Sequence, residues 1–264
     1  MRVVVLVKEV PDTTEVTIDR ETNTLVREGV PSIVNPFDMY AIEEALRIRE
    51  SHDGEATVTV MSMGPPQVEG SLREALAIGI DEAVLLSDRA FAGSDTWSTS
   101  YTLAAGIRKL GGADVILCGK QAIDGDTAQV GPGVAQFLEI PQVTFVRSLT
   151  VEGDRARAER MVEGGTDVLD VPLPALFTVV KDINEPRLPS LKGKMRAKKA
   201  EITIWGAGDL DVDESELGLD GSPTRVVKVF APEPRGGGRV LEGELEETVP
   251  ELVDELLPIV TGEG

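Results

Sequence analysis

Residues 113–133 read ADVILCGKQAIDGDTAQVGPG and combine an apolar run, a glycine-rich loop and the start of a helix. The run at 113–119 is mainly apolar, with Val115, Ile116 and Leu117 in succession, which is typical of a strand buried on both faces of a parallel sheet. Glycines that allow close approach to the loop backbone stand at positions 119, 125 and 131. A helix predicted from Gln129 to Leu138 would offer free N–H groups to phosphate. From the residues alone, a nucleotide loop and an ordinary glycine-rich connection both stay open.

Similar segments precede this stretch along the chain. Aliphatic strands are predicted at 3–7, 56–64 and 82–88. Helices are predicted from Asn35 as N-cap with Pro36 at the first position, over 65–79, and from Ser94 or Asp95 to Gly111. Strands that alternate with helices imply crossover connections and a parallel sheet.

The pattern changes after Pro141. Strands are predicted at 142–151, 156–162 and 174–180, with glycine turns between them, and the last is expected to return to the main sheet. The basic stretch after Pro189 is predicted to be helical. The fold class is therefore α/β, with a Rossmann-like parallel sheet and flanking helices, a small β-rich part and an extended C-terminal arm.

Two domains are predicted. Residues 1–206 would form a Rossmann-like domain that carries the glycine-rich loop, and residues 207–264 a linker and arm that pack on a partner. The arm contains an acidic linker at 209–220, a strand-like run at 226–231 and an acidic helix at 245–260, limited by Pro250 and Pro258. Short strands are also predicted at 16–18 and 24–26.

The net charge of −20 argues against nucleic acid and anionic membranes as partners, because phosphate binding needs clustered Lys and Arg. A single cysteine, Cys118, excludes an internal disulfide framework. No segment has the length of a membrane span, and the N-terminal apolar run is too short for a signal peptide. We therefore expect a soluble, cytoplasmic protein. The exception to the acidity is the basic segment KGKMRAKK at 192–199.

Catalytic constellations are missing from the sequence. His52 is expected on the surface and Cys118 in the core, and no metal-ligand spacing appears. Asp124 and Asp126 lie in the glycine loop, where such residues more often form turns. The segments MGPP (63–66) and NPFD (35–38) are expected at the same sheet edge as the loop. Without an acid, base or nucleophile, the chemistry is expected to belong to a bound cofactor.

Several motifs together resemble the beta subunits of electron transfer flavoproteins, including the FixA-type group. In chain order, these motifs are VKEVPD at 7–12, NPFD at 35–38, GKQAIDGDTAQVG at 119–131, EGGTD at 163–167 with PLPA at 172–175, and NEPR at 184–187 with Leu191 and MRAKK at 195–199. The likeness spans residues 3–199, and the C-terminal part is less diagnostic.

The resemblance implies a heterodimer with an alpha subunit and an adenine nucleotide in the fold described above. The nucleotide would be structural AMP in simple carriers, or a second FAD that takes hydride from NADH in the electron-bifurcating group. The segments DGDTAQVG (124–131), 61–67 and 87–104 resemble the bifurcating group, and small residues at 92–94 would leave room for a flavin ring. FAD is therefore expected, with AMP as the alternative. The candidate cofactor-binding residues are Leu6, Asn35, Asp38, Met63, Gly64, Asp124, Gly125, Asp126, Thr127, Ala128, Gln129, Val130, Gly131 and Val134.

The segment at 184–199 resembles the family's recognition loop, in which a leucine enters an apolar pocket of a partner dehydrogenase. The residues expected to bind a partner are Glu185, Arg187, Leu191, Met195, Arg196 and Lys199. The resemblance implies an acyl-CoA-type flavin dehydrogenase as one partner and a quinone-reducing or ferredoxin-type acceptor as another. Lys192 replaces a proline of many members, and Arg196 replaces a lysine of mitochondrial ones.

The alternative function is a stand-alone ATP-binding protein of related α/β fold, similar to stress-protein ATP binders. Such a protein needs a loop that holds a triphosphate, and the sequence has neither a Walker A motif nor an SGGxDS loop.

Overall fold

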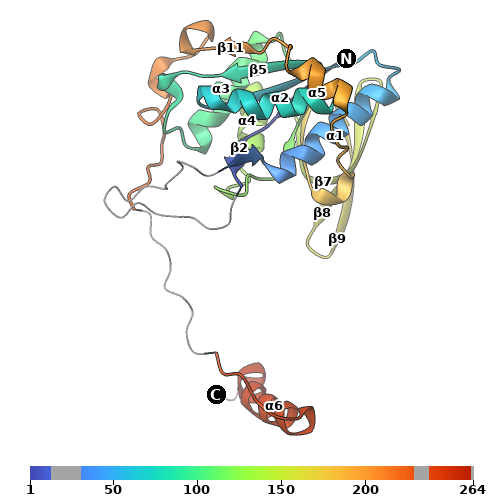
Figure 1. The fold of residues 1–264 in the computed structure, drawn as a ribbon, viewed down its shortest axis with the longest axis vertical. Helices are drawn as coiled ribbons and strands as arrows, with labels where there is room; N and C mark the ends of the chain where they lie inside the picture. The colour runs from blue at the N-terminus through green and yellow to red at the C-terminus, as the bar shows by residue number, and fades with distance from the viewer. Residues whose placement is uncertain (13–30, 229–237, 263–264) are drawn as a thin grey trace.

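The computed structural model describes residues 1–12, 31–228 and 238–262. The strands predicted at 16–18 and 24–26, and the end of the one predicted at 226–231, lie outside these residues. Within them, the α/β fold with a mainly parallel sheet is confirmed (Figure 1).

The described residues contain a nine-stranded sheet in the order β11-β5-β4-β1-β6-β10-β7-β8-β9. Parallel pairing joins β11 (Thr203–Trp205), β5 (Glu82–Leu86), β4 (Thr57–Met63), β1 (Arg2–Leu6), β6 (Val115–Gly119), β10 (Ala175–Val179) and β7 (Gln142–Glu152). Antiparallel pairing adds β8 (Arg155–Val162) and β9 (Gly165–Pro172). A separate pair is formed by β2 (Glu9–Pro11) and β3 (Ser32–Val34). The prediction that 174–180 returns to the main sheet is correct, since β10 lies between β6 and β7.

Helices cover both faces of the parallel part. One face packs against α1 (Pro36–Ser51) and α2 (Glu69–Ile78), in a core that includes Ile42, Leu46 and Leu72. The other packs against α3 (Thr96–Lys109) and α4 (Val130–Leu138), with Ile107 and Val134 in its core. Each core is mainly aliphatic, with Phe177 buried in the first and Phe91 in the second. The remaining helices are α5 (Leu191–Ala197), which lies against α2, and α6 (Leu245–Thr261).

Four strands in the described part of the chain were not predicted: β2, β3, β9 and β11. In β9 only Val171 is buried, so the strand carries no continuous apolar run. The other three, β2, β3 and β11, have three residues each, which is too short to show a period.

The acidic stretch at 209–220 differs from the predicted linker, because residues 210–217 pack along α3. Leu210 and Leu217 are buried in the core on that face. The Tyr101 hydroxyl accepts a hydrogen bond from the Asp213 N–H at 2.8 Å, and the Ser98 hydroxyl donates one to the Glu216 carbonyl at 2.9 Å. Two isolated leucines among carboxylates give no helical or strand period, so the sequence pattern did not reveal this contact.

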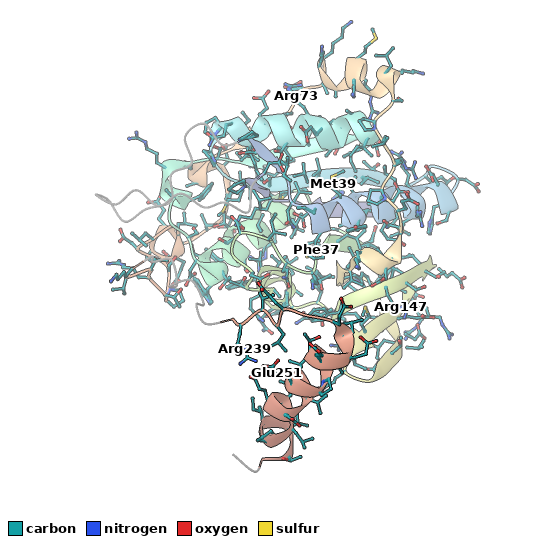
Figure 2. All side chains as sticks on the ribbon, turned by 60° about the horizontal axis from the view of Figure 1, so that its bottom comes forward. Phe37, Met39, Arg73, Arg147, Arg239 and Glu251 are labelled. Atoms are coloured by element: carbon teal, nitrogen blue, oxygen red, sulfur yellow. The ribbon has the colours of Figure 1, made fainter. Side chains whose placement is uncertain are left out.

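The predicted C-terminal helix is present as α6, but Pro250 and Pro258 lie inside it rather than limiting it. Figure 1 shows α6 apart from the sheet, and none of its residues is buried. Its ion pairs are local: Arg239 bonds to Glu251, and to Glu255 at 2.9 Å (Figure 2). No helix in the described part of the chain is long and apolar enough to span a bilayer.

Candidate functional site

The candidate site lies where the strand order reverses. From β1 the chain runs to β4 and β5 on one side, then crosses to β6 on the other side of β1. In open α/β sheets, ligands bind at the carboxyl ends of the strands beside such a switch point. Lys8 follows β1 there, the loop 120–129 follows β6, and the first turn of α1 lies over both strand ends.

Asp38 fastens the ends of β1 and β6 together. Its buried carboxylate accepts hydrogen bonds from the Lys8 N–H at 2.8 Å and from the Gly119 N–H at 2.9 Å. Burial raises the pKa of Asp38 from 3.8 to about 7, against the opposing effect of these N–H groups and of Asn35. A Cβ at Gly119 would lie 2.6 Å from an Asp38 oxygen, so only glycine fits at this strand end. Asp38 is therefore a structural brace of the switch point.

Asn35 holds the loop after β6. It takes the N-cap position of α1 as predicted, but its side chain makes no capping bond. Its amide donates instead to the Gln121 carbonyl at 2.9 Å, and its side-chain oxygen accepts from the Ile123 N–H at 3.1 Å. Its own N–H donates to the Lys8 carbonyl at 2.8 Å, which ties the loop to the end of β1 as well.

The carboxylates of the loop are held separately and do not form an acid–base pair. Lys8 Nζ lies 2.7 and 2.8 Å from the two oxygens of Asp124. Asp126 accepts from the Gln121 amide, and its N–H donates to the Ala122 carbonyl at 2.9 Å. Both residues thus shape the turn, as expected for aspartates in a glycine loop.

The backbone before α4 contains two residues with left-handed φ values and several N–H groups without a protein acceptor among the described residues. Asp126 and Ala128 have left-handed φ values of 56° and 55°, and Gln129 then has φ −109° and ψ −15°. Alternation of left- and right-handed residues turns successive N–H groups towards one point and favours anions. Within the described residues, no protein acceptor is recorded for the N–H groups of 127–129. These N–H groups lie at the positive end of the α4 dipole, where an anion is favoured.

The glycines predicted to admit a ligand have different roles. A Cβ at Gly131 would lie 2.8 Å from Cys118 Sγ and 2.9 Å from Thr178 Cγ2, so Gly131 lets α4 pack on the sheet. No atom lies within 4 Å of a Cβ at Gly125, which therefore faces open space. Cys118 is buried as predicted, and burial raises its thiol pKa well above the usual range.

The remaining candidate cofactor residues are spread around this edge. Leu6 and Val134 are buried in the core, while Thr127 is exposed and Val130 is partly exposed. Met63 and Gly64 lie at the carboxyl end of β4, where the Gly64 N–H donates to the Leu86 carbonyl at 3.0 Å. A Cβ at Gly93 would lie 3.0 Å from Leu219, so part of the space expected for a flavin ring near 92–94 is filled by Leu219.

The segment expected to bind a partner divides into inward and outward side chains. Leu191 and Met195 are exposed, by 78% and 61%, as is Lys199. Glu185 is exposed as well. Arg187 and Arg196 instead bond to α1 and α2, a role that the sequence pattern did not show.

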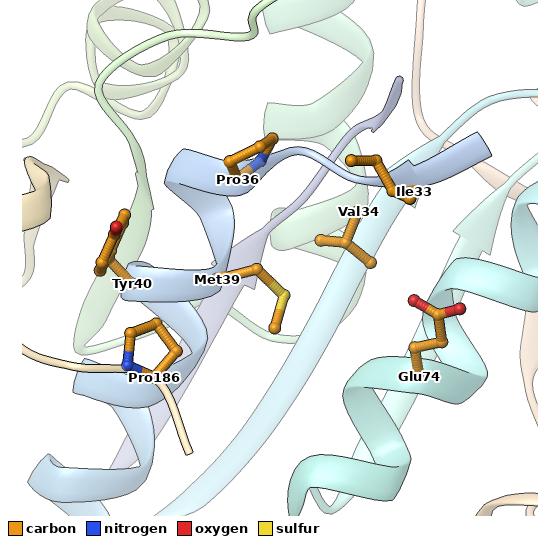
Figure 3. Close-up of a pocket in the computed structure, with 7 residues that line it drawn as sticks. All are labelled: Ile33, Val34, Pro36, Met39, Tyr40, Glu74 and Pro186. Atoms are coloured by element: carbon orange, nitrogen blue, oxygen red, sulfur yellow. The ribbon is translucent and has the colours of Figure 1, made fainter. Parts of the chain in front are cut away.

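A shallow hollow of about 410 Å³ lies between α1 and α2 (Figure 3). Its lining is Ile33, Val34, Pro36, Met39, Tyr40, Glu74 and Pro186. The pKa of Glu74 is raised above its usual value, mainly by burial and to a smaller extent by the negative charge of Glu9. The hollow offers an acidic group rather than phosphate donors, so we do not assign the nucleotide to it. The described residues contain no cluster of side chains able to hold a metal ion.

Comparison with known proteins identifies the family of the chain. The electron transfer flavoprotein domain family matches residues 22–210. The chain belongs to the electron transfer flavoprotein family. It is 53% identical, over 97% of its length and 98% of the relative, to the electron transfer flavoprotein subunit beta of Thermoanaerobacterium thermosaccharolyticum. The predicted beta-subunit, FixA-like membership is thereby confirmed.

Two further relatives carry more specific names. The chain is 50% identical to the caffeyl-CoA reductase-Etf complex subunit CarD of Acetobacterium woodii, over 97% of this chain and 98% of that protein. It is 46% identical to protein FixA of Sinorhizobium fredii, over 97% of this chain and 92% of that protein. An electron-transfer role follows from the family.

Proposed function

We propose that this chain is the nucleotide-binding beta subunit of a heterodimeric electron transfer flavoprotein and that it binds FAD at the switch point between β1 and β6. The observation that carries the proposal is the loop 121–129. Asn35 and Lys8 hold this loop at its start, and its backbone N–H groups at 127–129 are left for an anion. The stand-alone ATP binder has no support from the family match.

Each residue of the site has a physical task in this proposal. The N–H groups of 127–129 bind the diphosphate, and the open side of Gly125 lets it approach the backbone. Lys8 and Asp124 fix the loop, and Asp38 keeps the two strand ends together. Lys8 is therefore present at the site, where its charge is paired with that of Asp124. A bound flavin supplies hydride acceptance and single-electron release, neither of which a side chain here can supply.

The second candidate is a carrier whose beta subunit binds structural AMP. The anion site described above would accept the phosphate of AMP as well, so the loop geometry alone does not separate the two. FAD is favoured by the DGDTAQVG loop sequence and by similarity to the caffeyl-CoA reductase complex subunit and to FixA. With FAD bound, we propose oxidation of NADH and division of its electrons between two routes.

The partners belong to the same proposal. The alpha subunit would cover α6, which has no buried residue and in which apolar side chains such as Leu252 and Leu256 are 45% exposed. A flavin dehydrogenase of the acyl-CoA type would bind residues 184–199, and a quinone-reducing or ferredoxin-type protein would be the final acceptor. We place this complex in the cytoplasm.

A pair of substitutions at Ala128 tests the anion site. At φ 55° a β-branched side chain is strained, so Ala128→Val should change the direction of the neighbouring N–H groups and lower nucleotide occupancy. Ala128→Gly is the matched control, because glycine adopts this φ freely and should retain the nucleotide. Nucleotide released from each purified heterodimer would be measured by absorbance. Full occupancy in the Val variant would show that this turn does not bind the nucleotide.

A further inference from the structure

The segment 184–199 is fixed to the body of the protein at its N-terminal end by α1. Arg187 donates to both carboxylate oxygens of Glu43, at 2.8 and 3.0 Å, and to Glu50 at 2.5 Å. The Arg187 N–H also donates to Glu43, at 3.1 Å. The Asn184 amide adds bonds to Glu44 and to the Tyr40 carbonyl, both 3.0 Å. Such a two-sided guanidinium contact is geometrically specific, and lysine cannot reproduce it.

The ion pairs of Arg187 with Glu43 and Glu50 stabilise the attachment of the segment to α1. The Glu43 side chain is only 4% exposed, so its charge depends on nearby donors. Burial alone would raise the pKa of Glu43, but hydrogen bonds from Arg187 and Arg47 hold it below the usual value. The bonds to Glu50 and Glu43 in turn raise the pKa of Arg187.

The C-terminal end of the segment is fixed to α2. Arg196 donates to the carbonyls of Leu76 and Ile80, both at 2.8 Å, where α2 ends. In the opposite direction, Arg73 of α2 donates to the carbonyls of Ala197 and Ala200, at 2.6 and 3.0 Å. A Cβ at Gly193 would lie 2.1 Å from the Ala77 carbonyl oxygen, so α5 is in close contact with α2.

Between these two attachments, the segment presents apolar side chains to solvent. Leu188 is 89% exposed and Leu191 78%, and Met195 lies one turn after Leu191 on α5. We name these three residues the docking patch. Lys192, Lys194, Lys198 and Lys199 surround it in sequence, and within the described residues they form no ion pair.

We propose that Arg187 and Arg196 are positioning residues that hold the docking patch in place, and that the lysines around the patch, which form no ion pair in the described residues, present the charge that the partner binds. The partner surface that fits is an apolar pocket with carboxylates at its rim. An apolar centre within a charged rim is the usual anatomy of a specific interface. With a net charge of −20, the protein as a whole repels acidic surfaces. The basic rim of the docking patch attracts them locally, so an acidic partner would bind at this patch in preference to other parts of the surface. The inference rests on the proposed function of 184–199 as the docking segment.

The test compares Arg187→Gln, Glu43→Gln and their double variant with Arg187→Lys and Lys199→Gln in the heterodimer. Hydrogen exchange of amides 188–197 reports whether the segment is held. Exchange should rise about tenfold or more in Arg187→Gln, less in Arg187→Lys, and not in Lys199→Gln. The double variant should match Arg187→Gln, because the two residues act through one contact. Nucleotide content should be unchanged in all of them.

The second readout is electron uptake from an acyl-CoA dehydrogenase reduced by its substrate. Arg187→Gln and Lys199→Gln should both raise KM for the heterodimer without changing kcat, and only Lys199→Gln should also weaken the salt dependence of KM. Wild-type exchange in Arg187→Gln, together with a raised KM, would make Arg187 a direct partner contact and overturn the inference. If the wild-type protein takes no electrons from the dehydrogenase, the proposed partner class fails, and exchange alone still decides the role of Arg187.

Discussion

The buried carboxylate of Asp38 joins the ends of β1 and β6, and its effect on the free energy of unfolding should depend on pH. Its pKa is raised from 3.8 to about 7 in the fold, and the cause is burial. Because the folded-state pKa lies above the unfolded one, Asp38 adds stability that is complete below about pH 4. That stability is lost as the pH rises through about 7. The direction is opposite to that of an ion-paired aspartate.

The magnitude follows from the size of the shift. One pKa unit corresponds to about 1.4 kcal/mol, so between pH 5 and pH 8 this group should remove about 3 kcal/mol from the free energy of unfolding. Asp38→Asn abolishes this contribution. The variant retains one oxygen acceptor, but its amide group meets a second backbone N–H, which leaves a buried donor unpaired at a cost of about 1–3 kcal/mol.

Urea unfolding of the wild-type protein and of Asp38→Asn at half-unit steps from pH 5 to pH 8 would measure both effects. The stability advantage of the wild-type protein should shrink by about 3 kcal/mol over this range. The control Asp211→Asn removes an exposed carboxylate and should change stability by roughly 0.5 kcal/mol or less. An advantage that stays constant, or that grows with pH, would refute the assignment of Asp38 as a desolvated carboxyl.

Two further predictions concern helix packing and the arm. Gly131→Ala should lower the free energy of unfolding by about 1–3 kcal/mol, because its Cβ would crowd Cys118 and Thr178. The control Gly125→Ala should change the free energy of unfolding by roughly 0.5 kcal/mol or less. Urea titrations measure both, and equal effects would contradict the packing role of Gly131. Truncation after Gly243 removes α6 and should weaken the heterodimer in sedimentation without altering the unfolding of the sheet and its covering helices. Truncation after Gly206 also removes Leu210 and Leu217 and should destabilise the sheet and its covering helices as well. An unchanged heterodimer without α6 would remove the arm from the interface.

The sequence predicted the parts of the fold that carry a period or a glycine signal. The aliphatic strands at 3–7 and 113–119 and the glycine loop after the second one are close to β1, β6 and the site at the switch point. It did not predict β9, whose side chains are mostly exposed. It also missed the contact of Leu210 and Leu217 with α3, since two leucines among carboxylates form no pattern.

The sequence correctly predicted that residues 35–38 and 63–66 lie at the same sheet edge as the glycine loop. It did not predict which contacts the individual side chains make. Asn35 is at the N-cap position, yet its side chain bonds across to Gln121 and Ile123, far away in the chain. Arg187 and Arg196 belong to the segment 184–199 that is expected to bind a partner, and only the positions of Glu43 and of the end of α2 show that they bond to the body of the protein. Long-range partners of this kind are not encoded in local spacing.

The central claim is that this chain binds FAD, and counting nucleotides in the purified heterodimer tests it most directly. The complex would be denatured, and the released nucleotides would be separated and quantified per heterodimer. We predict two FAD per complex, one from each subunit, and bleaching of flavin absorbance when NADH is added to the intact protein. One FAD and one AMP would contradict the claim and make the protein a simple electron carrier with a structural nucleotide in this subunit.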